Sequence, residues 1–140
     1  MDVTPYILFN GNGAEAIRYY ETHLGAKNTL ILKHAGSPAE AHVPPEWKEK
    51  ILHARFQIGD TVIMASDAPP GNQSKSGGFA LSLQAKSVAE GERFTKALGA
   101  GGQMSMPAGP SFFADFFAML TDRFGVPWMV IYPGSKQTPR

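Results

Sequence analysis

The chain has 140 residues, enough for one compact domain or for two small modules that share a core. Its composition, 43% apolar and 18% charged, is that of a globular protein, and a net charge of +1 gives no reason to expect a nucleic acid or an acidic partner. The absence of cysteine excludes disulfides, thiol catalysis and zinc sites built on cysteine. The first residues do not resemble a signal peptide, and no apolar run approaches the ~20 residues of a membrane span. We therefore expect a cytoplasmic protein without a membrane partner.

The first half of the chain is predicted to form one strand, one helix and three further strands. Short apolar runs alternate with turn residues, and the one long run with helical periodicity comes second. A Pro- and Ala-rich excursion at 34–50 is too long for a tight turn, so we expect a flap or a packed surface loop. The predicted elements are a strand at 6–9, a helix at 14–24, and strands at 28–33, 52–58 and 61–66.

The first helix has a clear apolar stripe and recognisable ends. Ile17, Tyr20 and Leu24 recur at helical spacing and should face the core. Asn12 is expected to cap the first turn, and Gly25 is expected to end the helix in a left-handed conformation.

The strand at 52–58 alternates between two kinds of side chain, which predicts two different faces. A two-residue hairpin turn at Gly59-Asp60 should lead into the next strand. One face carries Leu52, Ala54, Phe56 and Ile58, and the other carries His53, Arg55 and Gln57.

The second half repeats the first at an offset of 74 residues. Leu24-Gly-Ala26 matches Leu98-Gly-Ala100, and Tyr20, Ile7 and Phe9 match Phe94, Leu81 and Leu83. Residues 68–78 have the composition of a linker. The repeat consists of a strand at 79–83, a helix at 88–98, and strands near 103–106, 113–120 and 128–132.

This repeat predicts an α+β fold of two βαβββ modules, about 1–67 and 79–134, within a single domain spanning 1–140. One helix covers only one face of a four-stranded sheet, so the other face must meet the partner half, another chain or a ligand. We expect curled mixed sheets around a cleft, and we expect function to reside in that cleft. The apolar run at 112–120, together with this uncovered sheet surface, predicts a homodimer.

Several segments resemble the PhnB-like branch of the vicinal-oxygen-chelate superfamily, which includes glyoxalase I, extradiol dioxygenases and bleomycin-sequestering proteins. The resemblance implies the same paired-module fold and is consistent with a dimer. Some members of the branch carry a demethylubiquinone-methyltransferase label. The segments are Thr4-Pro-Tyr-Ile-Leu-Phe-Asn-Gly11, Ala14-Glu-Ala-Ile-Arg-Tyr-Tyr20, His53-Ala-Arg-Phe-Gln-Ile-Gly-Asp60, Met64-Ala-Ser-Asp67 and Thr121-Asp-Arg-Phe-Gly-Val-Pro-Trp128.

Enzymes of that superfamily typically hold a divalent metal with His, Gln or Glu from four strands. The matching positions here are Pro5, Met64, Phe79 and Met129, and shifting by one or two residues finds no His or Glu. We therefore predict no metal site and no cofactor.

Other candidate residues have plain alternatives. His23 suits a helix C-terminus, while His34 and His42 are expected to be solvent-exposed, or else flap residues over the cleft. Asp115 lies among aromatic residues, where a raised pKa would suit acid–base work, although a charge that protects an edge strand is the simpler interpretation. The G-x-G-x-x-A segment at 11–16 is expected to be a strand-to-helix turn, because no acidic residue follows the next strand as a dinucleotide site requires.

The leading hypothesis is a protein that binds a small amphiphilic organic molecule. A metal-independent enzyme using His53 or Asp115, a drug-sequestering resistance protein and a purely structural or regulatory dimer are alternatives. Arg55 would hold an anionic or carbonyl end of the ligand, beside His53 and Gln57. The expected apolar lining consists of Ile7, Phe9, Val62, Met64, Leu81, Leu83, Met129 and Ile131.

Overall fold

A computed structural model describes residues 1–136 of the chain. It divides into two compact units, the first ending at Ser74 and the second beginning at Lys75, a boundary inside the predicted linker. Each unit has one four-stranded mixed sheet and one long helix, which confirms the predicted α+β class. Within residues 1–136, no helix combines the length and apolar character needed to cross a bilayer.

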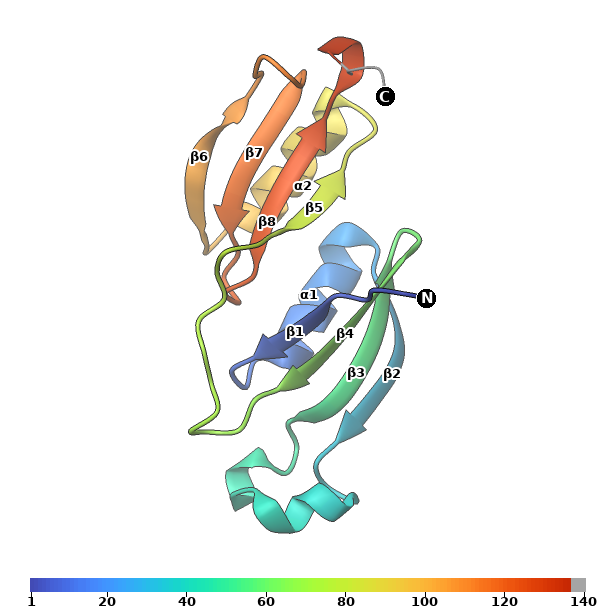
Figure 1. Ribbon diagram of the computed structural model, residues 1–140, viewed down its shortest axis with the longest axis vertical. Helices are drawn as coiled ribbons and strands as arrows, with labels where there is room; N and C mark the ends of the chain where they lie inside the picture. Colours follow the sequence, from blue (N-terminus) through green and yellow to red (C-terminus); the bar gives the residue numbers. More distant parts are fainter. Residues whose placement is uncertain (137–140) are drawn as a thin grey trace. The chain divides into compact units, whose positions relative to one another are not determined.

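The first unit is a sheet of strand order β1-β4-β3-β2 with α1 on one face (Figure 1). The β1–β4 pair is parallel, and the other two pairs are antiparallel. Its elements are β1 (Tyr6–Phe9), α1 (Gly13–Leu24), β2 (Lys27–Lys33), β3 (Ile51–Ile58) and β4 (Thr61–Asp67).

The core of this unit lies between α1 and the sheet, as the helical stripe predicted. Ile17, Tyr20 and Leu24 are buried, and the Tyr20 ring stacks on Phe56 of β3 with centroids 6.1 Å apart. Gly25 ends the helix with φ of 69°, a left-handed conformation that a residue with a side chain rarely adopts.

The prediction for the start of α1 was wrong, because Asn12 makes no capping hydrogen bond with its side chain. The buried carboxylate of Asp67, at the end of β4, takes that role. Its Oδ1 accepts hydrogen bonds from the backbone N–H groups of Gly11 (3.1 Å) and Gly13 (2.9 Å). Its Oδ2 accepts one from Ile51 (2.9 Å), so one side chain joins the helix, β3 and β4.

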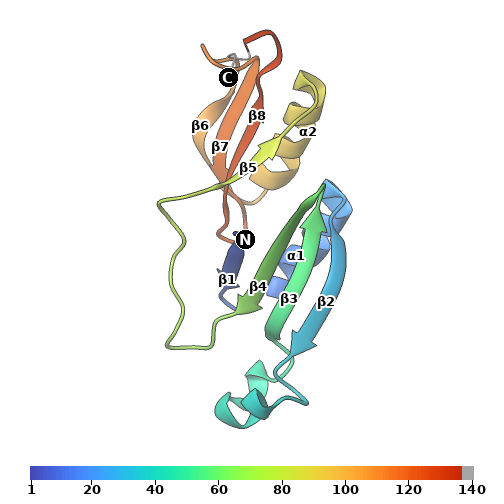
Figure 2. The same ribbon diagram turned by 45° about the vertical axis from the view of Figure 1, so that its right-hand side comes forward.

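The excursion between β2 and β3 is packed rather than free. It contains two short helices, η1 (Pro38–His42) and η2 (Pro45–Trp47), at one end of the first sheet (Figure 2). Trp47 is buried against Gly11, where an added Cβ would stand 2.8 Å from the ring, and Lys50 Nζ donates to the Gly11 carbonyl at 2.8 Å.

The expected exposure of His34 was wrong, since its ring is buried and its Nδ1 donates to the Lys50 carbonyl at 3.0 Å.

The second unit repeats the layout, with strand order β5-β8-β7-β6 and α2 on one face (Figure 2). The β5–β8 pair is parallel, as β1–β4 is. Phe116 of β7 lies under α2 at Gly91, where an added Cβ would be 2.7 Å from the ring. The elements are β5 (Leu81–Gln84), α2 (Val88–Gly99), β6 (Gln103–Gly109), β7 (Phe116–Thr121), β8 (Pro127–Tyr132) and the short η3 (Gly134–Lys136).

The turn between β7 and β8 is built around buried Asp122. Its Oδ1 accepts from the backbone N–H groups of Phe124 (2.9 Å) and Val126 (3.0 Å), and its Oδ2 accepts from Trp128 Nε1 (2.9 Å). Gly125 has φ of 91°, as expected from the turn sequence.

Asp115 precedes β7, a central strand, so the edge-strand interpretation was wrong. Its carboxylate accepts from the Ser135 backbone N–H at 2.9 Å and from the Ser135 hydroxyl at 2.8 Å, which fixes η3 to the sheet. These two hydrogen bonds, with the charge of Lys136, lower the pKa of Asp115 below its ordinary 3.8 and outweigh desolvation. The raised pKa that acid–base work by Asp115 would need is therefore contradicted.

This lowered pKa predicts a pH dependence of stability. The folded state binds a proton at Asp115 less readily than the unfolded state does, so the stabilisation is fully present above the unfolded pKa. It is lost as pH falls through the lower folded pKa. Urea unfolding between pH 2 and pH 6 should show a smaller acid loss for Asp115→Asn than for the wild type. Equal acid losses would contradict the role of Asp115.

Candidate functional site

The pairing register divides the first sheet into two faces. Paired residues point to the same side, and neighbours along a strand alternate. Ala54 and Phe56 are buried with Ile63 and Ala65 beneath α1. We call the opposite side the open face; it carries Tyr6, Leu8, Leu30, Leu32, His53, Arg55, Gln57, Val62, Met64 and Ser66.

The alternation predicted for β3 is thus confirmed: His53, Arg55 and Gln57 share one face. Arg55 pairs with Met64 on one side and Leu30 on the other, while Met64 also pairs with Tyr6. The guanidinium is therefore placed in a row of large, largely apolar side chains. Among residues 1–136, Arg55 is exposed and its side chain has no hydrogen-bond or ion-pair partner.

His53 lies beside a tyrosine on the same face. The Tyr6 hydroxyl and His53 Nδ1 are joined by a hydrogen bond of 3.1 Å, and the two rings stack with centroids 5.7 Å apart. This contact fixes the orientation of the imidazole. Tyr6 was not singled out in the sequence, because β1 is apolar throughout and shows no alternation.

The expected apolar lining does not lie on one surface. Ile7 pairs with Ala65 and Phe9 with Asp67, so both point beneath α1, and Phe9 is only 2% exposed. Val62 and Met64 lie on the open face. Ile7 and Phe9 therefore face the α1 side of the sheet rather than Arg55.

The second sheet shows the same division. Leu81 and Leu83 pair with buried Trp128 and Val130, which places them on the α2 side like their counterparts Ile7 and Phe9. Met129 and Ile131 lie on the opposite side. The repeat thus correctly predicted that β1 and β5 are equivalent strands. The predicted direction of their side chains, into a cleft, was wrong.

Metal-ligating residues do not gather anywhere in residues 1–136: no group of three or more His, Asp or Glu side chains could hold an ion. His23 is exposed in the last turn of α1, and His42 is exposed in η1, as expected.

The glycine-rich segment at 11–16 is a strand-to-helix turn. An anion bound at such a helix start would use the N–H groups of Gly11 and Gly13. Both already donate to Asp67, so the chain's own carboxylate fills that position.

A family model described as 3-demethylubiquinone-9 3-methyltransferase matches residues 1–131. Protein YjdN of Escherichia coli K12 is 36% identical over 138 residues, covering 93% of this chain and 94% of its own. The solved structure of PA1353 from Pseudomonas aeruginosa is 44% identical, with a TM-score of 0.84 and coverage of 94% and 97%.

More distant solved structures share the fold. A PhnB protein from Bacillus cereus, itself titled a putative 3-demethylubiquinone-9 3-methyltransferase, is 20% identical with a TM-score of 0.80, covering 94% of this chain and 99% of its own. The fosfomycin resistance protein FosX from Listeria monocytogenes is 12% identical with a TM-score of 0.64, covering 97% and 95%. The chain therefore belongs to the family described by that model, whose label the PhnB structure also carries, and it has the fold of PhnB and FosX.

Proposed function

We propose that this protein binds a small amphiphilic organic molecule with an anionic or carbonyl end on the open face of the first sheet. The observation that carries the proposal is the exposed Arg55 guanidinium, which has no side-chain partner in residues 1–136 and lies between Met64 and Leu30. Apolar walls with a few polar groups are the usual composition of a small-molecule site.

The energetics favour an anion at Arg55. A hydrogen bond to a charged group contributes about 1.5–3 kcal/mol, and it gains strength where apolar neighbours exclude water. The exposed side chains of Tyr6, Leu8, Leu30 and Leu32 offer the apolar surface for the rest of the ligand. Gln57 lies two residues along the same strand and supplies a second polar group.

Replacing Arg55 with alanine is expected to weaken binding of an amphiphilic anion about tenfold or more, because the charge-assisted contact is lost. Calorimetric titration with aryl phosphonates and sulfonates measures this change. Arg18→Ala is the matched control, since it removes the same charge from an exposed position of α1, which covers the other side of the sheet. Equal affinity of Arg55→Ala and wild type would remove Arg55 from the site.

A second candidate function is metal-independent acid–base catalysis by His53. The observation that favours it is the Tyr6–His53 hydrogen bond, which orients the imidazole beside Arg55. A bound anion would then lie beside an imidazole, the side chain most often used as a general acid or base. Sequestration of a drug, as implied by the resemblance to bleomycin-sequestering proteins, is one form of the simpler binding proposal.

The methyltransferase description of the family receives less support from the fold. Each sheet has a single parallel strand pair, whereas nucleotide-type cofactor sites of doubly wound folds use an extended parallel sheet with a free glycine-rich turn. Asp67 also occupies the N–H groups of the glycine-rich turn. We therefore favour binding over methyl transfer.

Homodimer formation remains a prediction. Phe112 is 92% exposed just before β7, and Met106 is exposed on β6. Apolar side chains left in water in this way support association with a second copy.

A further inference from the structure

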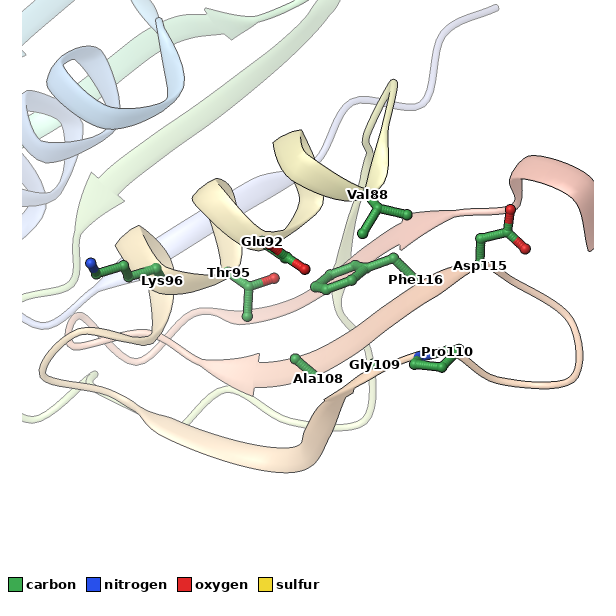
Figure 3. A pocket seen from close by; sticks show the side chains of 9 residues that line it. All are labelled: Val88, Glu92, Thr95, Lys96, Ala108, Gly109, Pro110, Asp115 and Phe116. Carbon is green, nitrogen blue, oxygen red and sulfur yellow. The ribbon is translucent and has the colours of Figure 1, made fainter.

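A groove in the second unit lies on the α2 side of its sheet (Figure 3). Its volume is about 320 Å³, enough for a compact organic molecule. It is lined by Val88, Glu92, Thr95, Lys96, Ala108, Gly109, Pro110, Asp115 and Phe116.

The groove arises because β6 departs from regular pairing. Met106 pairs with Met119, but the next pair along is Gly109 with Phe117, so β6 has an extra residue there. Pro107 has no N–H to continue the ladder. The displaced end of β6 forms one wall, and the α2 residues, spaced as one helical face, form the other.

Thr95 is the unusual member of this lining. Thr95 is only 8% exposed, yet its side-chain hydroxyl has no hydrogen-bond partner in residues 1–136. A buried hydroxyl without a partner is unfavourable, so it marks a position where a hydrogen-bonding ligand atom would be favourable. Figure 3 shows the Thr95 side chain directed into the groove beside the Phe116 ring.

The charged side chains around the groove limit which charges and polar groups a ligand can carry. Asp115 already accepts from Ser135, whereas the exposed ammonium of Lys96 has no partner within the described part of the chain. Thr95 and Lys96 are consecutive in α2 and both carry donors, which suits an acceptor group. Figure 3 shows the Lys96 side chain extended away from Thr95, so the lysine turns toward a bound acceptor. The lining holds two carboxylates, Glu92 and Asp115, against the one ammonium of Lys96, so a ligand should carry no more than one negative charge and hold it next to Lys96.

We propose that this groove binds a small monocarboxylate. One carboxylate oxygen accepts a hydrogen bond from the Thr95 hydroxyl, and Lys96 neutralises the charge. The apolar body of the ligand lies on Phe116 between Val88 and the Ala108–Pro110 wall.

The test uses benzoate as the probe and the full chain carrying Arg55→Ala, so that binding at the open face does not interfere. In amide NMR titrations, benzoate is expected to shift the signals of Thr95, Lys96, Ala108 and Gly109. Thr95→Val should weaken benzoate binding about threefold to tenfold, and Thr95→Ser should retain it. Thr22→Val on α1, where the hydroxyl donates to the Arg18 carbonyl at 3.1 Å, is the control that should leave binding unchanged.

A second comparison separates the roles of the two donors. Lys96→Gln should weaken benzoate binding about threefold and leave the neutral analogue benzyl alcohol unaffected, whereas Thr95→Val should weaken both. If Thr95 is only an unsatisfied core hydroxyl, Thr95→Val would raise the melting temperature without changing benzoate affinity. That result, or shifts confined to residues outside the groove, would overturn the proposal. Neither result would bear on Arg55 and the open face.

Discussion

Replacing Asp67 with alanine is expected to lower the free energy of unfolding by about 3–5 kcal/mol. The substitution leaves three backbone N–H groups without their acceptor: those of Gly13 and Ile51, which are buried, and that of Gly11, which is partly buried. It also removes a negative charge from the N-terminus of α1, where the helix dipole favours it. Because a typical domain is stable by only about 5–15 kcal/mol, this is one of the largest effects expected for a single substitution in this chain.

Urea unfolding followed by circular dichroism measures the change. Asp60→Ala is the matched control, since Asp60 is an exposed carboxylate in the β3–β4 turn and should change stability by less than about 0.5 kcal/mol. Asp67→Asn should be intermediate, because one amide oxygen still accepts while the NH₂ group faces a donor. A loss below about 1 kcal/mol for Asp67→Ala would show that Asp67 does not hold the helix, β3 and β4 together.

Replacing Asp122 with alanine is expected to lower the free energy of unfolding by about 3 kcal/mol, because it disrupts the β7–β8 turn of the second unit. The carboxylate accepts from Phe124, Val126 and the Trp128 indole, so its removal leaves buried donors and loosens the turn that sets the strand register. Trp128→Phe removes only the indole donor. The double variant should therefore lose less than the sum of the two single losses.

Tryptophan fluorescence allows the Asp122 effect to be localised. The chain contains two tryptophans, so a Trp47→Phe background leaves Trp128 as the fluorescent reporter of the second unit. In that background, Asp122→Ala should shift the urea midpoint of Trp128 fluorescence to lower concentration. Asp2→Ala, an exposed carboxylate near the N-terminus, should not shift it. Additive losses in the Asp122→Ala and Trp128→Phe double variant would show that their hydrogen bond contributes little.

Sequence patterns predicted the parts of the fold that local periodicity determines. The stripe of Ile17, Tyr20 and Leu24 identified the buried face of α1, and alternation in β3 placed Arg55 opposite Phe56. Both inferences depend only on which residues share a face of one element. The 74-residue repeat extended them to the second unit.

Features set by contacts distant in the sequence could not be predicted in this way. The facing of β1 was one, because Tyr6-Ile-Leu-Phe9 is apolar at every position and only its register with β4 shows that Phe9 is buried. Asp67 stands directly before the predicted linker, and nothing in the local sequence distinguishes it from a solvent-exposed strand end. Its hydrogen-bond partners are distant in the sequence: Gly13 and Gly11 lie 54 and 56 residues before it, and Ile51 lies 16 residues before it.

The site showed the same limit. Arg55 and His53 were found by alternation, but Tyr6 became a neighbour of His53 only through the sheet order β1-β4-β3-β2. Thr95 gave no signal, because a threonine near the end of an amphipathic helix is ordinary. The Thr95 hydroxyl lines a groove only because β6 departs from regular pairing with β7.

The parallel pairing of the first and last strands in each unit has a consequence for synthesis on the ribosome. β1 leaves the exit tunnel early, but its partner β4 begins at Thr61, so neither edge of β1 is paired until almost the whole first unit has emerged. The same holds for β5, which waits for β8. Such non-local closure folds slowly and leaves apolar strands exposed meanwhile. Each nascent unit therefore passes through a period in which a short apolar strand is available to chaperones or to other chains.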